Sequence, residues 1–290
     1  MIKQTVHWLL CSVFLMTCPH GRSDSDMNKA AEPMTDLVIT RNLSYEPGDR
    51  HSLDVYALRA ADKPRPVIVY IYGGNWVAGA KSDFAWIGAA LARRGFVVVV
   101  PDYRVYPQAR WPMFLQDNAG AVRWARDHAA TYGGDPSKLV LMGHSAGANS
   151  ALSLATDPRW LSGVGMARSD LKAMIGLSGP YNLSPLDTPR EIAIFGPPTG
   201  YTDPINLIEA GSPPVLLAIG NRDDAADPHD SDAVAAKLRE KGGLAEVIHY
   251  PDLGHSDTQE ALALPPGSPP GIIDAILRFL AAQGAAPPPP

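Results

Sequence analysis

The segment Gly143-His144-Ser145-Ala146-Gly147 matches the pattern G-x-S-x-G, which carries nucleophilic chemistry in many hydrolases. The apolar residues 139–142 before it are typical of a strand, and the small residues 146–155 after it are typical of a helix. A sharp turn between strand and helix raises a serine hydroxyl out of the sheet. The pattern therefore predicts a nucleophile at Ser145. It also predicts that the N–H of Ala146, at the start of the helix, faces a developing oxyanion.

A serine nucleophile needs a base that is itself oriented by an acid, and enzymes with this turn place the histidine last in the chain. Three histidines follow Ser145. His249 lies in a strand pattern, where we expect it to be half-buried, and His229 lies in an acidic loop, where we expect it to be solvated. His255 follows the last strand pattern on a glycine-containing loop, so it is the predicted base.

The acid is expected directly after the strand pattern 215–219, where Asp223 is the first choice and Asp224 and Asp227 are the alternatives. A competing interpretation treats five carboxylates as a calcium loop, but their spacing does not match the D-x-D-x-D-G ligand pattern. We therefore expect no metal. The five residues of that interpretation are Asp223, Asp224, Asp227, Asp230 and Asp232.

Paired glycines follow another buried strand pattern, in the segment Tyr72-Gly73-Gly74-Asn75-Trp76. Glycine lets a backbone turn sharply and present its N–H groups without a Cβ in the way. Together with the predicted nucleophile, this loop indicates an oxyanion hole. Its predicted donors are the N–H groups of Gly74, Asn75 and Ala146.

The elements that would position these residues alternate between strand-like and helix-like patterns. This alternation predicts an α/β fold with a mostly parallel sheet covered on both faces, preceded by two antiparallel entry strands. The expected strands are 37–40, 52–58, 67–72, 96–100, 138–142, 173–178, 215–219 and 245–250, and the expected helices are 83–94, 112–131, 146–155, 230–240 and 272–282.

The longest break in the alternation is 179–214, which we interpret as a low partial cap over the carboxyl edge of the sheet. We expect one catalytic domain over residues 31–284, followed by a Pro-rich tail at 285–290. Hydrophobic residues make up 46% of the 290-residue chain, enough for a sizeable core. The net charge of −5 comes without a basic run, so we expect no nucleic-acid partner.

Residues 1–30 read as a signal peptide or lipoprotein signal followed by a linker. One lysine precedes the apolar run 8–16, which is too short to span a membrane. The segment Leu15-Met16-Thr17-Cys18 resembles a bacterial lipobox, which would attach a lipid and a membrane tether at Cys18. These features predict an exported protein, periplasmic or lipid-anchored at the cell envelope. The alternative is a cytoplasmic protein with a frayed N-terminus.

The chain resembles the α/β-hydrolases, and within them the branch of carboxylesterases that includes hormone-sensitive lipase and the acetyl-xylan and feruloyl esterases. The resemblance implies the α/β-hydrolase fold, a Ser145-Asp223-His255 triad and the three oxyanion donors named above. It departs at Tyr72, where the family usually has histidine. The motifs that carry it are Tyr72 to Trp76, Pro101 to Arg104, Tyr132 to Pro136, Gly143 to Ala148, Tyr250-Pro251 and Gly254-His255.

The resulting hypothesis is a serine carboxylesterase that cleaves small-molecule esters without a cofactor. A neighbouring alternative is hydrolysis of amides in the manner of an aryl-formamidase, because that related family carries a similar Gly-Gly-x-Trp loop. An alternative of another class is a catalytically silent α/β-hydrolase that serves as a binding module. Proteins of this last kind usually lack one triad member, whereas all three positions are filled here.

Overall fold

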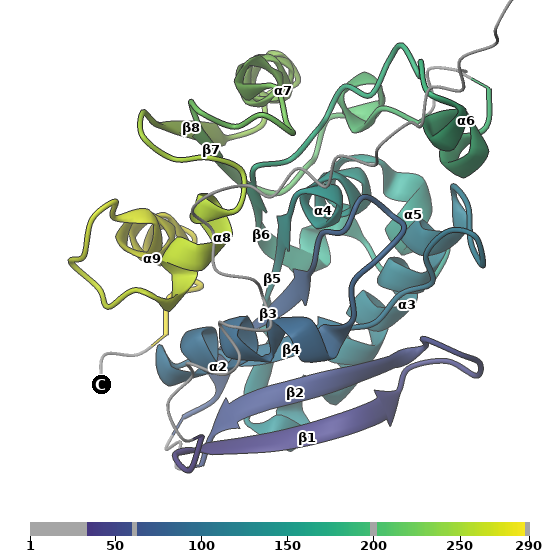
Figure 1. The fold of residues 1–290 in the computed structure, drawn as a ribbon. Helices are drawn as coiled ribbons and strands as arrows, with labels where there is room; N and C mark the ends of the chain where they lie inside the picture. The colour runs from purple at the N-terminus through teal and green to yellow at the C-terminus, as the bar shows by residue number, and fades with distance from the viewer. Residues whose placement is uncertain (1–33, 60–62, 198–201, 288–290) are drawn as a thin grey trace, which may run out of the picture.

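The computed structural model describes residues 34–59, 63–197 and 202–287. An eight-stranded sheet in the order β1-β2-β4-β3-β5-β6-β7-β8 runs through the molecule (Figure 1). β1 (Leu37–Ser44) and β2 (Ser52–Leu58) form an antiparallel ribbon at one edge, and β2 also pairs antiparallel with β4 (Val97–Pro101). Every pair from β4 to β8 is parallel. The α/β class and the antiparallel entry predicted from the sequence are confirmed.

The other elements follow in the predicted alternation. The remaining strands are β3 (Arg65–Ile71), β5 (Gly134–His144), β6 (Leu171–Leu177), β7 (Val215–Gly220) and β8 (Ala245–Tyr250). The α-helices are α2 (Ala85–Arg93), α3 (Met113–His128), α4 (Ala146–Thr156), α5 (Pro158–Ser162), α6 (Pro189–Phe195), α7 (Pro228–Glu240), α8 (Asp257–Glu260) and α9 (Ile272–Ala282), and the 3₁₀ turns are η1 (Lys81–Phe84), η2 (Ala129–Tyr132), η3 (Arg168–Asp170), η4 (Pro204–Leu207) and η5 (Ala261–Ala263).

The central strands are buried on both faces because helices cover both sides of the sheet. Residues 67–71 of β3 and 97–100 of β4 are almost entirely apolar and have at most 1% of their surface exposed. On one face α3, α4 and α5 pack against one another, and on the other α2 and α9 meet through η5 (Figure 1). The uninterrupted apolar runs in the sequence reflect this double burial.

Two expectations from the sequence need correction. The expected helix 112–131 ends at His128 and continues only as the 3₁₀ turn η2. His249 is exposed rather than half-buried, because β8 is the edge strand and pairs only with β7. The expected solvation of His229, at the start of α7, is confirmed.

The predicted export signal, including Cys11 and Cys18, lies outside the described residues. Within the part of the chain that the structure describes, no helix has the length and apolar character needed to cross a membrane.

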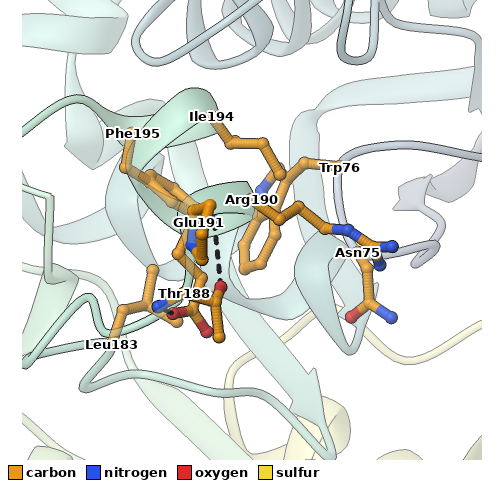
Figure 2. A pocket seen from close by; sticks show the side chains of 9 residues that line it. Asn75, Trp76, Leu183, Thr188, Arg190, Glu191, Ile194 and Phe195 are labelled. Carbon is orange, nitrogen blue, oxygen red and sulfur yellow. Dashed lines mark hydrogen bonds between the residues drawn. The ribbon is translucent and has the colours of Figure 1, made fainter. Parts of the chain in front are cut away.

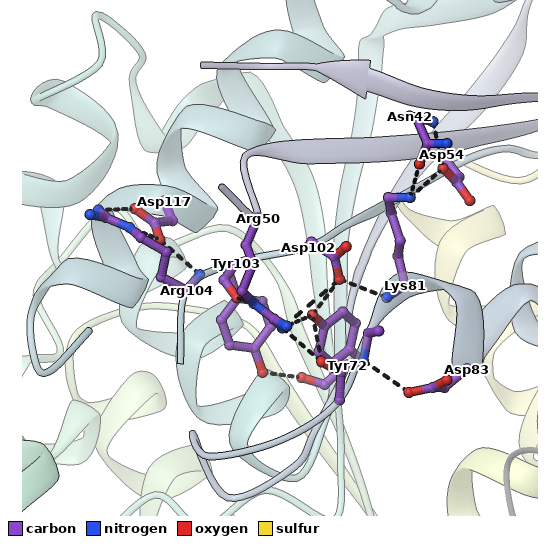
Figure 3. A network of polar contacts seen from close by, with 12 residues as sticks. Asn42, Arg50, Asp54, Tyr72, Lys81, Asp83, Asp102, Tyr103, Arg104 and Asp117 are labelled. Atoms are coloured by element: carbon purple, nitrogen blue, oxygen red, sulfur yellow. Dashed lines mark hydrogen bonds and ion pairs between the residues drawn. The ribbon is translucent and has the colours of Figure 1, made fainter. Parts of the chain in front are cut away.

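A buried ion pair ties the antiparallel ribbon to the segment after β3. Lys81 Nζ lies 2.9 Å from Asp54 Oδ1 on β2 and donates to Asn42 Oδ1 on β1 at 2.6 Å (Figure 3). Both charged side chains are less than 10% exposed. Removal of one member of such a pair leaves the other charge buried without compensation, which is costly. The pair therefore holds the start of η1 in place.

We expect Lys81→Met to lower the free energy of unfolding by about 3–5 kcal/mol, because Asp54 would lose its cationic partner in a buried site. Lys138→Met is the matched control, since its pair with Asp135 is longer (3.6 Å) and partly exposed. The control should cost less than about 1 kcal/mol. Urea denaturation of both variants measures the difference, and equal losses would contradict the assigned role of Lys81.

Candidate active site

Ser145 occupies the turn between β5 and α4, at φ 53° and ψ −126°. Its N–H donates to the carbonyl of Leu177 at 2.9 Å, which fixes the turn against β6. The turn also needs glycine at position 147, because a Cβ there would lie 2.0 Å from the carbonyl oxygen of Ile71. The start of α4 thus lies directly against the end of β3. Ser145, in the turn before α4, is placed at the carboxyl end of the sheet.

The structure brings together the three residues predicted for a triad. His255 Nε2 lies 2.9 Å from Ser145 Oγ. His255 Nδ1 lies 2.9 Å and 3.0 Å from the two carboxylate oxygens of Asp223. Asp223 comes from the loop after β7 and His255 from the loop after β8, so three strand ends contribute to one continuous chain of hydrogen bonds.

The protein environment keeps Asp223 ionised. Burial alone would raise the pKa of this carboxyl group, but its hydrogen bond and Coulomb attraction with His255, together with two backbone hydrogen bonds, lower the pKa by more. The backbone N–H groups of Ala225 and Ala226 also donate to Asp223 Oδ1, at 3.0 Å and 2.8 Å. The net pKa is below its usual value, so Asp223 accepts the Nδ1 hydrogen of His255.

His144, the variable residue of the G-x-S-x-G pattern, supports the histidine loop. Its Nε2 lies 2.9 Å from the carbonyl oxygen of His255 and donates to it, since a carbonyl can only accept. Burial, together with the nearby His255 imidazole, lowers the pKa of His144 to about 3. His144 therefore stays neutral. No sequence pattern indicates this role, because the contact of His144 with His255 spans 111 residues of chain.

The glycine loop after β3 lies against the serine. A Cβ at Gly73 would be 2.8 Å from Ser145 Cβ, and one at Gly74, whose φ is 130°, would be 2.3 Å from the carbonyl oxygen of Ala78. The N–H groups of Gly74, Asn75 and Ala146 meet no acceptor among the described residues. All three predicted donors thus come from segments adjacent to Ser145 with unused hydrogen-bonding capacity.

Tyr72 anchors this glycine loop through its hydroxyl group. The Tyr72 O–H donates to Asp102 Oδ1 at 2.7 Å and accepts from Arg50 Nη2 at 2.9 Å (Figure 3). Arg50 Nη2 also donates to the carbonyl of Gly79 at 2.7 Å, and the N–H of Lys81 donates to Asp102 at 2.7 Å. Both ends of the segment 73–80 are therefore held by one network.

The Tyr72 ring is fully buried between two other aromatic rings. Its centroid lies 4.9 Å from that of Phe84 and 4.8 Å from that of Tyr103, both in stacked arrangements. The hydroxyl of Tyr103 also donates to the Tyr72 carbonyl at 2.7 Å. Burial strongly raises the pKa of Tyr72, so its hydroxyl stays protonated. Where the family usually has histidine, this chain uses a neutral donor aimed at a carboxylate.

The other carboxylates of the acidic loop have separate partners. Asp224 is exposed, and Asp227 Oδ1 caps α7 by accepting the N–H of His229 at 2.9 Å. Asp230 accepts the N–H groups of Tyr181 and Asn182, and Asp232 pairs with His249. Within the described residues, no group of three or more potential ligands is arranged to hold a metal ion.

A family model described as BD-FAE matches residues 53–238, which span β2 to most of α7. The chain belongs to the BD-FAE family. It is 31% identical over 244 residues to the probable isoprenylcysteine alpha-carbonyl methylesterase ICMEL1 of Arabidopsis thaliana, over 76% of this chain and 51% of that protein. It therefore spans about half the length of this relative. It is also 29% identical over 221 residues to carboxylesterase NlhH of Mycobacterium tuberculosis, over 69% of each chain.

Among solved structures, the apo form of Thermogutta terrifontis esterase 2 has a TM-score of 0.72 and 24% sequence identity to this BD-FAE chain. The match covers 89% of this chain and 98% of that one. Another structure shows the same esterase phosphorylated by paraoxon. The likeness in structure confirms the α/β-hydrolase fold that the sequence motifs imply.

A cavity of about 640 Å³ lies beside the glycine loop of this BD-FAE member. Asn75 and Trp76 line one side, and α6 lines the other together with Leu183 (Figure 2). The segment 179–214, interpreted from the sequence as irregular, thus contains a short helix at the edge of the site. The proline and glycine content of the segment argued against a helix. Thr188 and Glu191 nevertheless form a capping box at the start of α6, which is a sequence signal for a helix.

We expect Tyr72→Phe to lower kcat/KM for 4-nitrophenyl acetate by about 10- to 100-fold, because a buried hydrogen bond to a charged group is worth about 1.5–3 kcal/mol. Tyr181→Phe is the matched control, since Tyr181 is equally buried and its hydroxyl has no hydrogen-bond partner among the described residues. Steady-state kinetics of both variants provide the measurement. Equal effects would contradict the anchoring role, and a loss beyond about a thousandfold would mean that the phenol contacts the reacting atoms.

Proposed function

We propose that this chain is a serine carboxylesterase that hydrolyses small carboxylic esters through an acyl-enzyme on Ser145. The observation that carries the proposal is the chain of hydrogen bonds from Ser145 Oγ through His255 to Asp223, with donor–acceptor distances of 2.9–3.0 Å. Such an arrangement activates a hydroxyl group that is otherwise a poor nucleophile. Membership of the BD-FAE family supports the same reaction class.

In the proposed acylation step, Ser145 Oγ attacks the ester carbonyl carbon while His255 Nε2 takes the hydroxyl proton. Asp223 holds the Nδ1 hydrogen and stabilises the imidazolium that forms. The tetrahedral intermediate then collapses, the C–O bond to the alcohol breaks, and His255 returns the proton to the leaving alkoxide. Water attacks the acyl-enzyme by the same route and releases the carboxylic acid and free Ser145.

The negative charge on the tetrahedral oxygen would be stabilised by the N–H groups of Gly74, Asn75 and Ala146. These donors meet no acceptor among the described residues and lie on a loop held from behind by Tyr72. A neutral His144 also suits this mechanism. Its ring centroid is 4.8 Å from that of His255, so a charge on His144 would oppose formation of the His255 imidazolium.

The relatives support ester substrates over the alternatives. A methylesterase and a carboxylesterase are among them, and the structural neighbour phosphorylated by paraoxon carries a nucleophile that reacts with an activated phosphoester. No described residue of this site specifically favours amide hydrolysis or a silent binding module. Hydrolysis of N-formylaniline faster than of 4-nitrophenyl acetate would instead indicate an amide hydrolase.

We expect Ser145→Ala to reduce kcat for 4-nitrophenyl acetate by roughly 10⁴- to 10⁶-fold, since the nucleophile is removed without added bulk. Paraoxon should phosphorylate the wild type at Ser145, as mass spectrometry of the digested protein would reveal. Ser162→Ala, at an exposed serine, is the control and should behave as wild type. A folded Ser145→Ala variant that keeps more than a tenth of the activity would overturn the proposal.

We expect Asp223→Asn to lower kcat by about 10⁴-fold, because an amide favours the wrong tautomer of the histidine. The neighbouring Asp224→Asn is the matched control, and at an exposed carboxylate it should change kcat by less than about tenfold. Kinetics of both purified variants distinguish the two positions. A larger loss at Asp224 would move the acid to that residue.

A further inference from the structure

The cavity beside the glycine loop has an apolar floor. The Trp76 indole and the Phe195 ring meet edge to face with centroids 4.8 Å apart, and Ile194 lies next to them on α6. All three side chains are at least 94% buried. The floor is therefore rigid and apolar, and the small surface it leaves exposed can contact a methylene or aromatic group of a bound molecule.

The polar groups of the same cavity are not equivalent. Glu191 Oε2 accepts the N–H groups of Asp187 and Thr188 at 3.1 Å and 2.9 Å, and these bonds lower the pKa of Glu191. The Thr188 hydroxyl in turn accepts the N–H of Glu191 at 3.1 Å. Both side chains are thus engaged in capping the start of α6.

Arg190 differs from these capping residues. Its side chain is exposed and extends across the cavity toward Asn75, while Glu191 turns back toward Thr188 (Figure 2). Among the described residues, no carboxylate lies within ion-pair distance of Arg190. Arg190 also donates no hydrogen bond to any described residue, so within this part of the chain its guanidinium N–H groups are available to a ligand.

The cavity that Arg190 lines is connected to the proposed reaction centre through Asn75. Asn75 lines the cavity and also supplies a proposed oxyanion donor, and Gly73, two residues earlier, packs against Ser145. An ester whose carbonyl oxygen sits at these donors must extend its acyl or its alcohol part away from Ser145. The cavity is the space on the Asn75 side that can receive one of these parts.

We propose that the ester substrate carries a carboxylate group on the part that enters this cavity, and that Arg190 binds it. An apolar spacer would lie over Trp76 and Phe195, and the carboxylate would accept two parallel N–H bonds from the guanidinium, the geometry that arginine favours. Among the described residues that line this cavity, Arg190 is the one cation, so a single negative charge on the ligand matches it. This proposal rests on the proposed esterase function of Ser145.

Two pairs of esters test the proposal, each pair differing only in charge. In the first, 4-nitrophenol is esterified with adipic acid or with adipic acid monoamide, which places the charge on the acyl part. In the second, 3-carboxyphenyl acetate is compared with 3-carbamoylphenyl acetate, which places it on the alcohol part. In one of the two pairs we expect the wild type to favour the carboxylate by about five- to tenfold in kcat/KM, through KM. The preference should shrink in 1 M NaCl.

Arg190→Gln should abolish this preference, while Arg190→Lys should keep part of it. The rate with the uncharged member of the pair should fall less than the rate with the carboxylate, because a neutral amide lacks the charge attraction to the guanidinium. Lys172→Gln is the control, since it removes an exposed cation at the start of β6, whereas the site lies at the carboxyl ends of the strands. This control should retain the wild-type preference.

Absence of a carboxylate preference in both pairs would overturn the proposal. An equal effect of Arg190→Gln on both members of the preferred pair would also overturn it, because it would indicate a structural role. Failure of the proposed function itself looks different: the wild type would hydrolyse none of the four esters, or Ser145→Ala would hydrolyse them equally well.

Discussion

The close approach of helix α4 to strand β3 is the constraint on which the whole site depends. A side chain at Gly147 would lie within 2.0 Å of the Ile71 carbonyl oxygen, and one at Gly143 within 2.3 Å of the Gly147 carbonyl oxygen. Only glycine permits backbones to pass at such distances. This contact forces the turn at Ser145 into an uncommon conformation and brings the serine next to the glycine loop that continues from the same strand.

The parts of the structure that depend on short stretches of sequence could be predicted. Central strands read as apolar β-branched runs because both their faces are covered, and the turn at Ser145 is marked by five adjacent residues. Asp223 and His255 could be chosen because each follows a strand, and the carboxyl ends of parallel strands meet at one edge. In these cases a short stretch of chain contains most of the physical information.

What could not be predicted depends on contacts between distant segments. Arg50 meets Tyr72 across 22 residues, and Asp102 meets it across 30, so no local pattern reveals the network behind the glycine loop. The sequence shows only that Tyr72 stands where the family usually has histidine, and the partners of its hydroxyl, Asp102 and Arg50, become visible only in the folded chain. The exposure of His249 was missed for a similar reason. Edge strands and central strands can have similar sequences, and only the folded sheet shows that β8 lies at an edge.

The loop that carries His255 is secured from the middle of the sheet as well as from β8, the strand it follows. His144, at the end of β5, holds the His255 carbonyl, and Ser178, just after β6, shares a buried hydrogen bond of 2.8 Å with Thr258. Local opening of a sheet begins where pairing is one-sided, which here is β8. The contacts of His144 and Ser178 with this loop come from central strands, so they do not depend on the pairing of β8 and would still hold the loop if that edge frayed.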